Sequence, residues 1–374
     1  MAKVLVVGAG IFGTMHAYFA LKAGHEVTLV ERDPKPLSAS VRNFGMIAVG
    51  GRAAGDELKV ALRARELWGE LAQQHSELTF RPSGSILVAT SDNHLAVIEK
   101  VAQYPDASDR GWKALDRKQV MEMNPGIRGE RVTGGLYCSQ DAVVEPDRVL
   151  GEIRSIMHEN PRFEYLPGHD VVSVDETSDG VRLAIRGGKK VSGDIAFVVP
   201  GADHSSLFGE HLDSEPLRRV FLQMARLENP GVTLTTSIAN FDSLRFYPGY
   251  RGEPIDELEP VRPLVQEMVM QLLLQQRVDG TLTMGDTHVY EEPFPHEMRE
   301  DCYDLLLDEA ESILGTRPNI TTRWQGIYSQ NTADLICVRK KVTQKIMLVT
   351  GPGGRGNTLS PAIAETSMKE MFNV

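Results

Sequence analysis

The pattern of apolar and polar positions predicts a strand, a helix and a second strand at the N-terminus. Residues 3–7 form a short β-branched run, which is too short to be a helix. Residues 14–23 are typical of a helix, which Gly24 ends, and residues 26–33 are typical of a strand. This order predicts a βαβ unit whose first turn is GAGIFG, residues 8–13.

The glycine spacing in that turn is typical of a site for a dinucleotide. Gly8 permits a tight turn, Gly10 lets a pyrophosphate approach the backbone, and Gly13 lets the helix pack closely on the strand. Glu31 follows Gly13 by 18 residues, close to the spacing at which an acid binds a ribose hydroxyl. An acid there disfavours a 2′-phosphate, so the pattern leaves NAD and FAD open and disfavours NADP.

Three further segments favour FAD. Residues 38–47, SASVRNFGMI, follow the second strand with small and amide side chains that suit a loop around a flavin. Residues 345–365 predict a strand, a glycine-rich turn and a helix beginning near Ser360 and Pro361, so a second helix N-terminus can face a negatively charged group. Residues 193–207 predict another strand of the same sheet.

The remaining pattern predicts a second region that is rich in strands. Residues 58–75 and 301–314 are typical of helices, and residues 84–90 of a strand. After Leu217 we expect two strands and a hairpin whose turn contains Asp279-Gly280: residues 220–228, 243–248 and 268–286.

Composition and charge exclude several functional classes. The chain has 374 residues and a formal net charge of −11, with no dense basic stripe, which argues against a nucleic-acid partner. Cys138, Cys302 and Cys337 lie far apart without a CxxC pair, which argues against disulfides and zinc. No segment approaches the roughly 20 apolar residues of a membrane span. The N-terminus lacks the features of a signal peptide, so we expect a cytoplasmic protein.

The order of these segments resembles the D-amino-acid oxidase superfamily, which includes glycine oxidase and monomeric sarcosine oxidase. GAGIFG, Glu31, the loop with Ser40, Asn43, Gly45 and Met46, and residues 134–150 and 351–361 carry the resemblance. It implies an α/β (α+β mixed) fold, with a Rossmann-type FAD-binding domain interleaved with a substrate domain on a large mixed or antiparallel sheet. We expect residues 1–80, 140–215 and 322–374 in the first domain, and 81–139 and 216–321 in the second.

The resemblance also implies a chemistry and a set of cofactor contacts. Hydride would move from the carbon that bears the amine to FAD, and the imine would hydrolyse; O2 or another acceptor would reoxidise the cofactor. The site must bind the neutral amine, which an apolar pocket favours. The expected FAD contacts are Gly8, Gly10, Ile11, Phe12, Gly13, Glu31, Arg32, Ser40, Arg42, Asn43, Phe44, Gly45, Met46, Val171, Val172, Gly201, Gly353, Gly354, Arg355, Gly356, Asn357, Thr358 and Leu359.

Residues 323–334, RWQGIYSQNTAD, depart from two patterns of the superfamily. Where glycine oxidase-like members carry an arginine for the substrate carboxylate, this chain has Tyr328. Where sarcosine oxidases carry a cysteine bonded to the flavin, it has Gly326. The resemblance therefore implies noncovalent FAD and weakens the case for a plain carboxylate substrate.

Several side chains are candidates for the substrate site. We expect catalytic roles for His288, Tyr328 and Arg355, although His288 also fits a half-buried strand histidine and each arginine a surface salt bridge. The expected substrate-binding residues are Met46, Arg245, Tyr247, His288, Tyr328, Ser329 and Arg355, with Arg42 and Arg52 as alternatives. A metal near His288 and His296 is rejected because no regular ligand spacing is present.

A narrower resemblance concerns residues 40–47, 272–292 and 323–331, which are similar to a subgroup associated with aminoalkylphosphonate breakdown. It implies that 2-aminoethylphosphonate or its N-methyl form is oxidised to an aldehyde. A phosphonate carries up to two charges and three acceptor oxygens, so it needs several dispersed donors. The alternatives are a small amino acid such as glycine or sarcosine, a 2-hydroxy acid with His288 as base, and a nucleotide-binding sensor without turnover.

Overall fold

One part of the fold is a six-stranded sheet in the order β18-β19-β12-β1-β2-β8. In the computed structural model, which describes residues 1–333 and 335–373, five of these strands run parallel and β18 is antiparallel to β19. The strands are β1 (Lys3–Val7), β2 (Glu26–Val30), β8 (Phe163–Leu166), β12 (Ile195–Val198), β18 (Val338–Lys341) and β19 (Ile346–Thr350).

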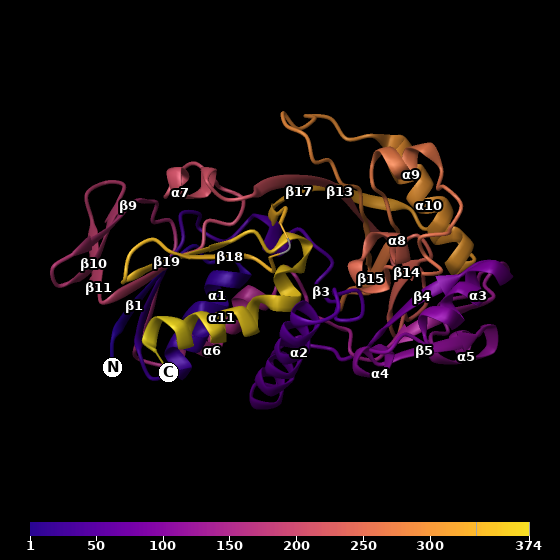
Figure 1. Ribbon diagram of the computed structural model, residues 1–374, viewed down its shortest axis with the longest axis horizontal. Coiled ribbons are helices and arrows are strands. Elements are labelled where there is room, and N and C mark those ends of the chain that lie inside the picture. The colour runs from indigo at the N-terminus through magenta and orange to yellow at the C-terminus, as the bar shows by residue number, and fades with distance from the viewer. Residues whose placement is uncertain (334, 374) are drawn as a thin grey trace.

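Both faces of this sheet are covered, which explains why its parallel strands are almost wholly apolar. On one face Val4 and Val6 pack against three helices, α1 (Ile11–Lys22), α6 (Val149–His158) and α11 (Gly356–Phe372). On the other face Leu5 and Val7 pack against a three-stranded sheet of β9 (Val171–Thr177), β10 (Gly180–Ile185) and β11 (Lys190–Gly193). Figure 1 shows these layers at the left of the molecule.

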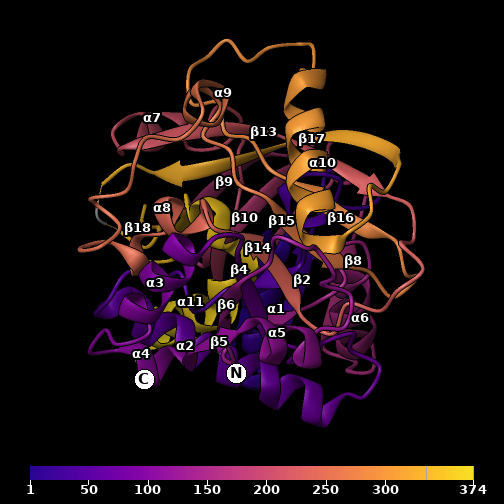
Figure 2. The same cartoon turned by 90° about the vertical axis from the view of Figure 1, so that its right-hand side faces the viewer.

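The second part is an eight-stranded sheet in the order β17-β13-β16-β15-β14-β4-β6-β5. Its pairs are antiparallel except for β14 with β4. The strands are β4 (Ser85–Ala89), β5 (Trp112–Asp116), β6 (Gly134–Cys138), β13 (Leu217–Leu227), β14 (Ser237–Asn240), β15 (Leu273–Gln276), β16 (Leu282–Gly285) and β17 (Ile320–Asn331). Helix α10 (Glu300–Leu314) packs its apolar face on this sheet, as Figure 2 shows.

Shorter elements connect these two parts. A two-stranded ribbon joins β3 (Met46–Ile47) and β7 (Ala142–Val143), and α2 (Asp56–Gln74) lies against α11. The other helices are α3 (Asp92–Val101), α4 (Ala107–Arg110), α5 (Arg117–Met123), α7 (Gly209–Asp213), α8 (Ser243–Phe246), α9 (Pro263–Glu267) and the 3₁₀ turns Ala39–Val41, Pro248–Tyr250 and Gly353–Arg355. None of the helices within residues 1–333 and 335–373 combines the length and apolar character that a membrane crossing needs.

The predicted fold class is confirmed, as are the N-terminal βαβ unit and the hairpin with its turn at Asp279-Gly280. The prediction of a strand over residues 243–248 is wrong. Residues Ser243–Phe246 form α8, and Pro248 cannot donate a ladder hydrogen bond, which disfavours a central strand there.

Two predicted boundaries also differ from the structure. The chain does not leave the eight-stranded sheet at Thr322, because β17 pairs with β13 until Asn331. The sequence pattern predicts that this helix begins near Pro361, but α11 begins at Gly356 and contains Pro361. Pro361 cannot donate to the carbonyl of Asn357, but Trp68 Nε1 donates to that oxygen across 2.9 Å and replaces the missing bond.

Candidate active site

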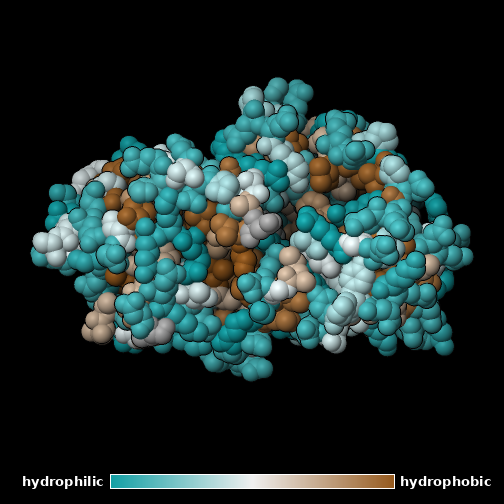
Figure 3. Space-filling view, in the orientation of Figure 1, coloured by the Kyte–Doolittle hydropathy of each residue, from teal (hydrophilic) through white to brown (hydrophobic). Residues whose placement is uncertain are grey.

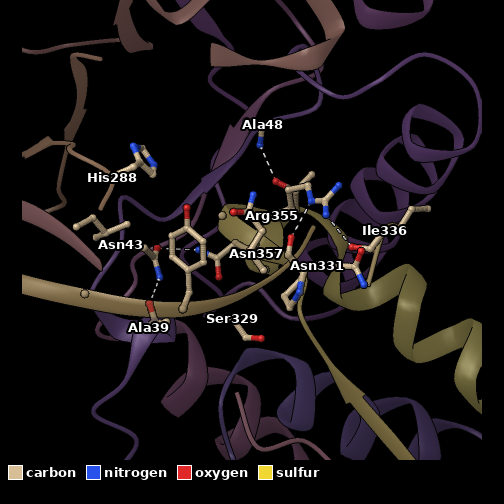
Figure 4. Close-up of a pocket in the computed structure, with 18 of the residues that line it drawn as sticks. Ala39, Asn43, Ala48, His288, Ser329, Asn331, Ile336, Arg355 and Asn357 are labelled. Carbon is tan, nitrogen blue, oxygen red and sulfur yellow. Dashed lines mark hydrogen bonds between the residues drawn. The ribbon is translucent and has the colours of Figure 1, made fainter. Parts of the chain in front are cut away.

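A cavity of about 820 Å³ is lined by residues of both large sheets and of the segments between them. Its wall includes the first residues of α1 and α11, the loop after β2, the segment 245–251, and parts of β13 and β17. Figure 3 shows apolar residues gathered near the middle of one face of the molecule, and Figure 4 shows the lining side chains.

The first wall element is the N-terminus of α1, where the predicted glycine roles are seen in the packing. A Cβ at Gly13 would lie 1.8 Å from the carbonyl oxygen of Gly8, and a Cβ at Gly8 would lie 2.3 Å from that of Val199. Gly10 lines the cavity, and Ile11 N donates to Ser40 Oγ across 2.9 Å. No acidic residue occupies the first turn, so the helix dipole is free to favour an anionic group.

The second wall element is the turn before α11. Gly353 has a φ of +64°, which favours glycine, and Gly354 and Gly356 also line the cavity. The first turn of α11 holds no acidic residue and no side-chain cap. Two helix N-termini therefore face one cavity, an arrangement suited to the phosphate and ring-carbonyl groups of FAD.

An asparagine network joins the loop after β2 to the first turn of α11. Asn43 Nδ2 donates to the carbonyl oxygen of Ala39 across 2.8 Å, and Asn43 Oδ1 accepts from Gly45 N and Asn357 Nδ2. Asn357 Oδ1 is buried and has no donor among residues 1–333 and 335–373. This acceptor can bind an N–H of the isoalloxazine ring, so the residues present fit the expected cofactor.

Most predicted cofactor residues line the cavity, although several do not. Those on the wall are Gly10, Ile11, Phe12, Ser40, Arg42, Asn43, Phe44, Met46, Gly201, Gly353, Gly354, Arg355, Gly356, Asn357 and Thr358. Gly8, Gly13, Gly45 and Leu359 are absent from the wall and instead permit close packing or lie within α11.

The remaining predicted cofactor residues also lie off the cavity wall. Glu31 accepts from Ala9 N and Asp33 N, and Arg32 donates to Asp203 Oδ2 across 2.7 Å. In β9, Val171 is buried, and Val172 is exposed. Contact of Glu31, Arg32, Val171 and Val172 with the adenosine end of FAD stays a prediction.

Tyr328 links the two sheet systems at the cavity. It lies opposite Val220 in the β13–β17 ladder, and a Cβ at Gly354 would be 3.8 Å from its hydroxyl oxygen. Desolvation raises the pKa of Tyr328 well above its usual value, so the phenol is neutral and can donate a hydrogen bond.

Two predicted substrate residues, Ser329 and Arg355, line the cavity but also contact other groups of the protein. Ser329 lines the cavity, and its hydroxyl is hydrogen-bonded to His204 Nε2 across 2.7 Å. Arg355 donates to the carbonyl oxygens of Pro352 and Ile336, and its Nη1 lies 3.2 Å from Glu57 Oε1. Because these partners occupy its guanidinium, the predicted catalytic and substrate-binding roles of Arg355 are not supported.

Arg245 and Tyr247 reach the cavity from a helical segment, and the expected strand is absent. The Arg245 guanidinium is engaged by the carbonyl oxygen of Glu259 at 2.7 Å and by Asp242 at 3.5 Å. Tyr247 accepts from Gln271 Nε2 across 3.3 Å, and burial raises its pKa well above the usual value.

His288 lines the cavity and is 3% exposed. Its Nδ1 lies 2.9 Å from the carbonyl oxygen of Val269, which can only accept, so Nδ1 carries a proton. Its Nε2 lies 3.6 Å from Asp286 Oδ2. In the described part of the chain no group of three or more His, Cys, Asp or Glu side chains is placed to hold a metal ion.

The structure adds wall residues that were missed from the sequence, namely Arg218, Gln271, Asp286 and Tyr290. The alternation of β17 and its pairing with β13 place Arg218 opposite Gln330, on the same face as Tyr328. Asp286 lies two residues before His288, so strand alternation was the signal that could have found it.

The comparisons with known proteins agree with this geometry. The chain matches the family model described as FAD dependent oxidoreductase (DAO) over residues 3–368. One of the subunits of the opine oxidase of Rhizobium meliloti is 24% identical over 198 residues, which cover 50% of this chain and 53% of that protein. The chain thus spans about half the length of the curated relative it matches.

Two solved structures share the fold. A glycine oxidase from Bacillus cereus has a TM-score of 0.80 and 15% identity, over 100% of this chain and 95% of that chain. The L-α-glycerophosphate oxidase of Mycoplasma pneumoniae, solved with FAD bound, has a TM-score of 0.75 and 15% identity, over 100% and 95%. With the family model matching nearly its whole length, the chain belongs to the DAO family of FAD-dependent oxidoreductases.

Proposed function

We propose that this chain oxidises the C–N bond of a small amine that also carries an anionic group, with 2-aminoethylphosphonate or its N-methyl form as the preferred substrate. When bound, FAD supplies the oxidant that accepts a hydride from the substrate. The residues of the chain bind the substrate, orient it and exclude water. Leu222, Met224 and Leu273 make an apolar part of the cavity wall, which disfavours the ammonium form of an amine.

The observation that carries this proposal is a pair of arginines with donor groups left over. Arg52 is 3% exposed and lies 5.2 Å from the centre of the Tyr247 ring. Its Nη1 lies 3.7 Å from Glu57 Oε1, and its Nε has no acceptor among the described residues. Arg218 donates from Nε to Gln330 and lies 3.8 Å from the centre of the Tyr290 ring. Both line the cavity.

Two separate guanidinium groups suit a phosphonate, which presents three acceptor oxygens in different directions. A single carboxylate is matched by one bidentate arginine, and Tyr328 stands where such a residue is expected from the resemblance. Two features therefore support a phosphonate substrate. The donor groups come from two separate arginines, and Tyr328 stands where an arginine for a carboxylate is expected.

We also propose that the FAD is held without a covalent bond. Gly326 has no side chain to bond to the flavin, and Cys138, Cys302 and Cys337 are buried outside the cavity wall. In this proposal, the N-termini of α1 and α11 and the Asn43–Asn357 network bind the cofactor.

The test is anaerobic bleaching of the flavin absorbance by a panel of small molecules. We expect bleaching with 2-aminoethylphosphonate or its N-methyl form, and at most slow bleaching with glycine, sarcosine and lactate. Faster bleaching by glycine or sarcosine would remove the phosphonate and keep C–N oxidation, and no bleaching by any amine would overturn the proposal. Reoxidation with O2 or with a dye then identifies the acceptor.

Arginine variants test the binding part of the proposal. Arg218→Gln and Arg52→Gln should each raise the KM for 2-aminoethylphosphonate about 10- to 100-fold, the loss of one charge-assisted contact. Arg182 is exposed on β10, so Arg182→Gln is the matched control and should leave KM within about twofold. Equal KM values for all three variants would show that the two arginines do not bind the anion.

A 2-hydroxy acid is the second candidate substrate, because the proton on His288 Nδ1 leaves Nε2 able to accept a proton from a hydroxyl. This candidate predicts that lactate bleaches the flavin faster than the amines do. It also predicts that His288→Ala removes that reaction, whereas unchanged lactate rates in His288→Ala would exclude His288 as the base.

A further inference from the structure

Asp286 and Gln271 lie side by side at the cavity. Asp286 N donates to the carbonyl oxygen of Gln271 across 2.9 Å, and Gln271 N donates back to that of Asp286 across 3.3 Å. Residues paired in this way project their side chains from the same face of the backbone ladder. Both side chains line the cavity wall, with exposures of 6% and 2%.

Each of these side chains has an acceptor without a donor. Asp286 Oδ1 and Gln271 Oε1 are buried, and neither receives a hydrogen bond from residues 1–333 or 335–373. Gln271 Nε2 donates to the Tyr247 hydroxyl, so the amide is oriented with its oxygen left over. Buried acceptors without donors are costly, which indicates that a ligand with N–H groups satisfies this pair.

Among the described groups that face Asp286, only His288 can carry a positive charge. His288 Nε2 lies 3.6 Å from Asp286 Oδ2, beyond hydrogen-bonding distance, and the proton on Nδ1 is directed to Val269. Tyr247, Tyr290 and Tyr328 are the phenols around it, and desolvation raises the pKa of each, so all three are neutral. No lysine or arginine of the described residues forms an ion pair with Asp286.

We propose that Asp286 and Gln271 form the subsite for the substrate ammonium group, and that the Asp286 carboxylate takes the proton that this group must lose before oxidation. An N–H bond of the ammonium breaks and an O–H bond of Asp286 forms, so the ammonium and carboxylate become a neutral amine and a carboxylic acid. No electrons are transferred in this step. The assignment rests on the proposed function, because only an amine substrate requires it.

The electrostatics of the site agree with this role. Burial raises the pKa of Asp286, and this outweighs the lowering effects of His288 and Gln271, so the carboxylate is closer in basicity to an amine than an exposed aspartate would be. A carboxylate that no lysine or arginine of the described residues pairs with also attracts an ammonium ion into the cavity. The two arginines described above then bind the other end of a zwitterionic substrate.

The test compares Asp286→Asn with Glu145→Gln by anaerobic stopped-flow reduction of the holoenzyme between pH 6 and pH 10. Glu145 is the control because it is a buried carboxylate, its pKa is raised by burial, and it lies off the cavity wall; unlike Asp286, it pairs with Arg81 and Arg277. The ligands are 2-aminoethylphosphonate with its des-amino analogue ethylphosphonate, and glycine with acetate.

In Asp286→Asn we expect the reduction rate at pH 7 to fall by about 100-fold, a typical contribution of a proton acceptor. The rate should recover toward that of the unmodified chain near pH 10, where the solution supplies the neutral amine. The affinity for the amine should fall about tenfold, and that for ethylphosphonate should stay within about twofold. Glu145→Gln should match the unmodified chain in all of these measurements.

A pH profile in Asp286→Asn that parallels the unmodified chain, or equal weakening of ethylphosphonate and the amine, would overturn the subsite. These results leave C–N oxidation standing if the unmodified chain is bleached by the amine. If no amine bleaches the unmodified chain, the proposed function fails, and thermal shifts with the same ligand pairs decide the subsite separately. The subsite is supported if the amine of each pair raises the melting temperature more than its analogue does and Asp286→Asn abolishes this difference. It is overturned if the amine and its analogue give equal thermal shifts.

Discussion

Asn43 and Asn357 lie 314 positions apart in the chain, and Asn357 Nδ2 donates to Asn43 Oδ1 across 2.9 Å. The contact joins the loop after β2 to the first turn of α11. Asn43 Oδ1 also accepts from Gly45 N, so one side chain orients its own loop and holds the distant helix. Two segments from opposite ends of the sequence are thereby held together at one cofactor site.

Replacing Asn43 should damage both stability and cofactor binding. Asn43→Ala removes three hydrogen bonds, which at about 1 kcal/mol each lowers the free energy of unfolding by about 2 to 3 kcal/mol. Urea unfolding followed by circular dichroism measures this loss, and the bound flavin per chain should fall as well. Asn229→Ala is the matched control, because exposed Asn229 makes the same local bond to the residue two positions on, Gly231 N, without the long-range contact. Similar losses in both variants would contradict the joining role.

Adding one methyl group should have opposite effects at two helical glycines. Gly13→Ala places a Cβ 1.8 Å from a backbone oxygen, so the turn must distort and we expect purified protein without flavin, or no folded protein. A Cβ at Gly151 in α6 meets no atom within 4 Å. Gly151→Ala should therefore keep the flavin and raise the free energy of unfolding by about 0.5 to 1 kcal/mol. Retention of full flavin content in Gly13→Ala would refute the close packing described for α1.

Acid denaturation should separate the flavin from the polypeptide. No cysteine lines the cavity within the described residues, and Gly326 carries no side chain, so the cofactor should be held by hydrogen bonds and helix N-termini alone. After precipitation with trichloroacetic acid we expect the yellow colour in the supernatant and a colourless pellet. A polypeptide mass increased by that of FAD would exclude noncovalent binding.

The buried His16 predicts a loss of stability in mild acid. Burial lowers the pKa of His16 to about 4, from 6.5 in the unfolded chain, so between these values the unfolded state binds more protons. The stability from neutral His16 is present above pH 6.5 and is lost as pH falls toward 4. At 1.36 kcal/mol per pH unit this amounts to about 2 to 3 kcal/mol by pH 4.5.

The measurement is urea unfolding at pH 7.5 and pH 4.5 for the unmodified chain and for His16→Gln. Other titrating groups are shared, so the drop in unfolding free energy between the two pH values should be smaller in His16→Gln by that amount. An equal drop in both proteins would mean that His16 is protonated in the folded state or that its surroundings open in acid.

The positions of the cofactor segments were readable from local patterns. GAGIFG, the loop from Ser40 to Met46 and the glycine-rich turn at 353–356 each combine residue types that only a few backbone conformations accept, and all three reach the cavity wall. The prediction of a strand over residues 243–248 was wrong because its alternating apolar residues also suit a short helix. Such a short run does not distinguish the period of a helix from that of a strand.

The substrate side of the site depended on pairings that no local pattern contains. Arg218 reaches the cavity because β13 pairs in register with β17, and the hydroxyl of Ser329 is already bonded to His204. The sequence does not reveal the partners of Arg355, but in the fold its guanidinium contacts Glu57 and two backbone carbonyl oxygens. Charge and spacing cannot show which donors are already used.

Local patterns of residues were enough to predict the βαβ unit, the two glycine-rich turns and the kind of cofactor they suit, because backbone conformation at glycines is a local property. Which side chains meet at the substrate end depends on contacts between distant parts of the chain. Asp286 and Gln271 become partners through a backbone pairing across 15 residues, and Asn43 and Asn357 through a side-chain hydrogen bond across 314. Such contacts arise from strand register and packing, which depend on the whole chain.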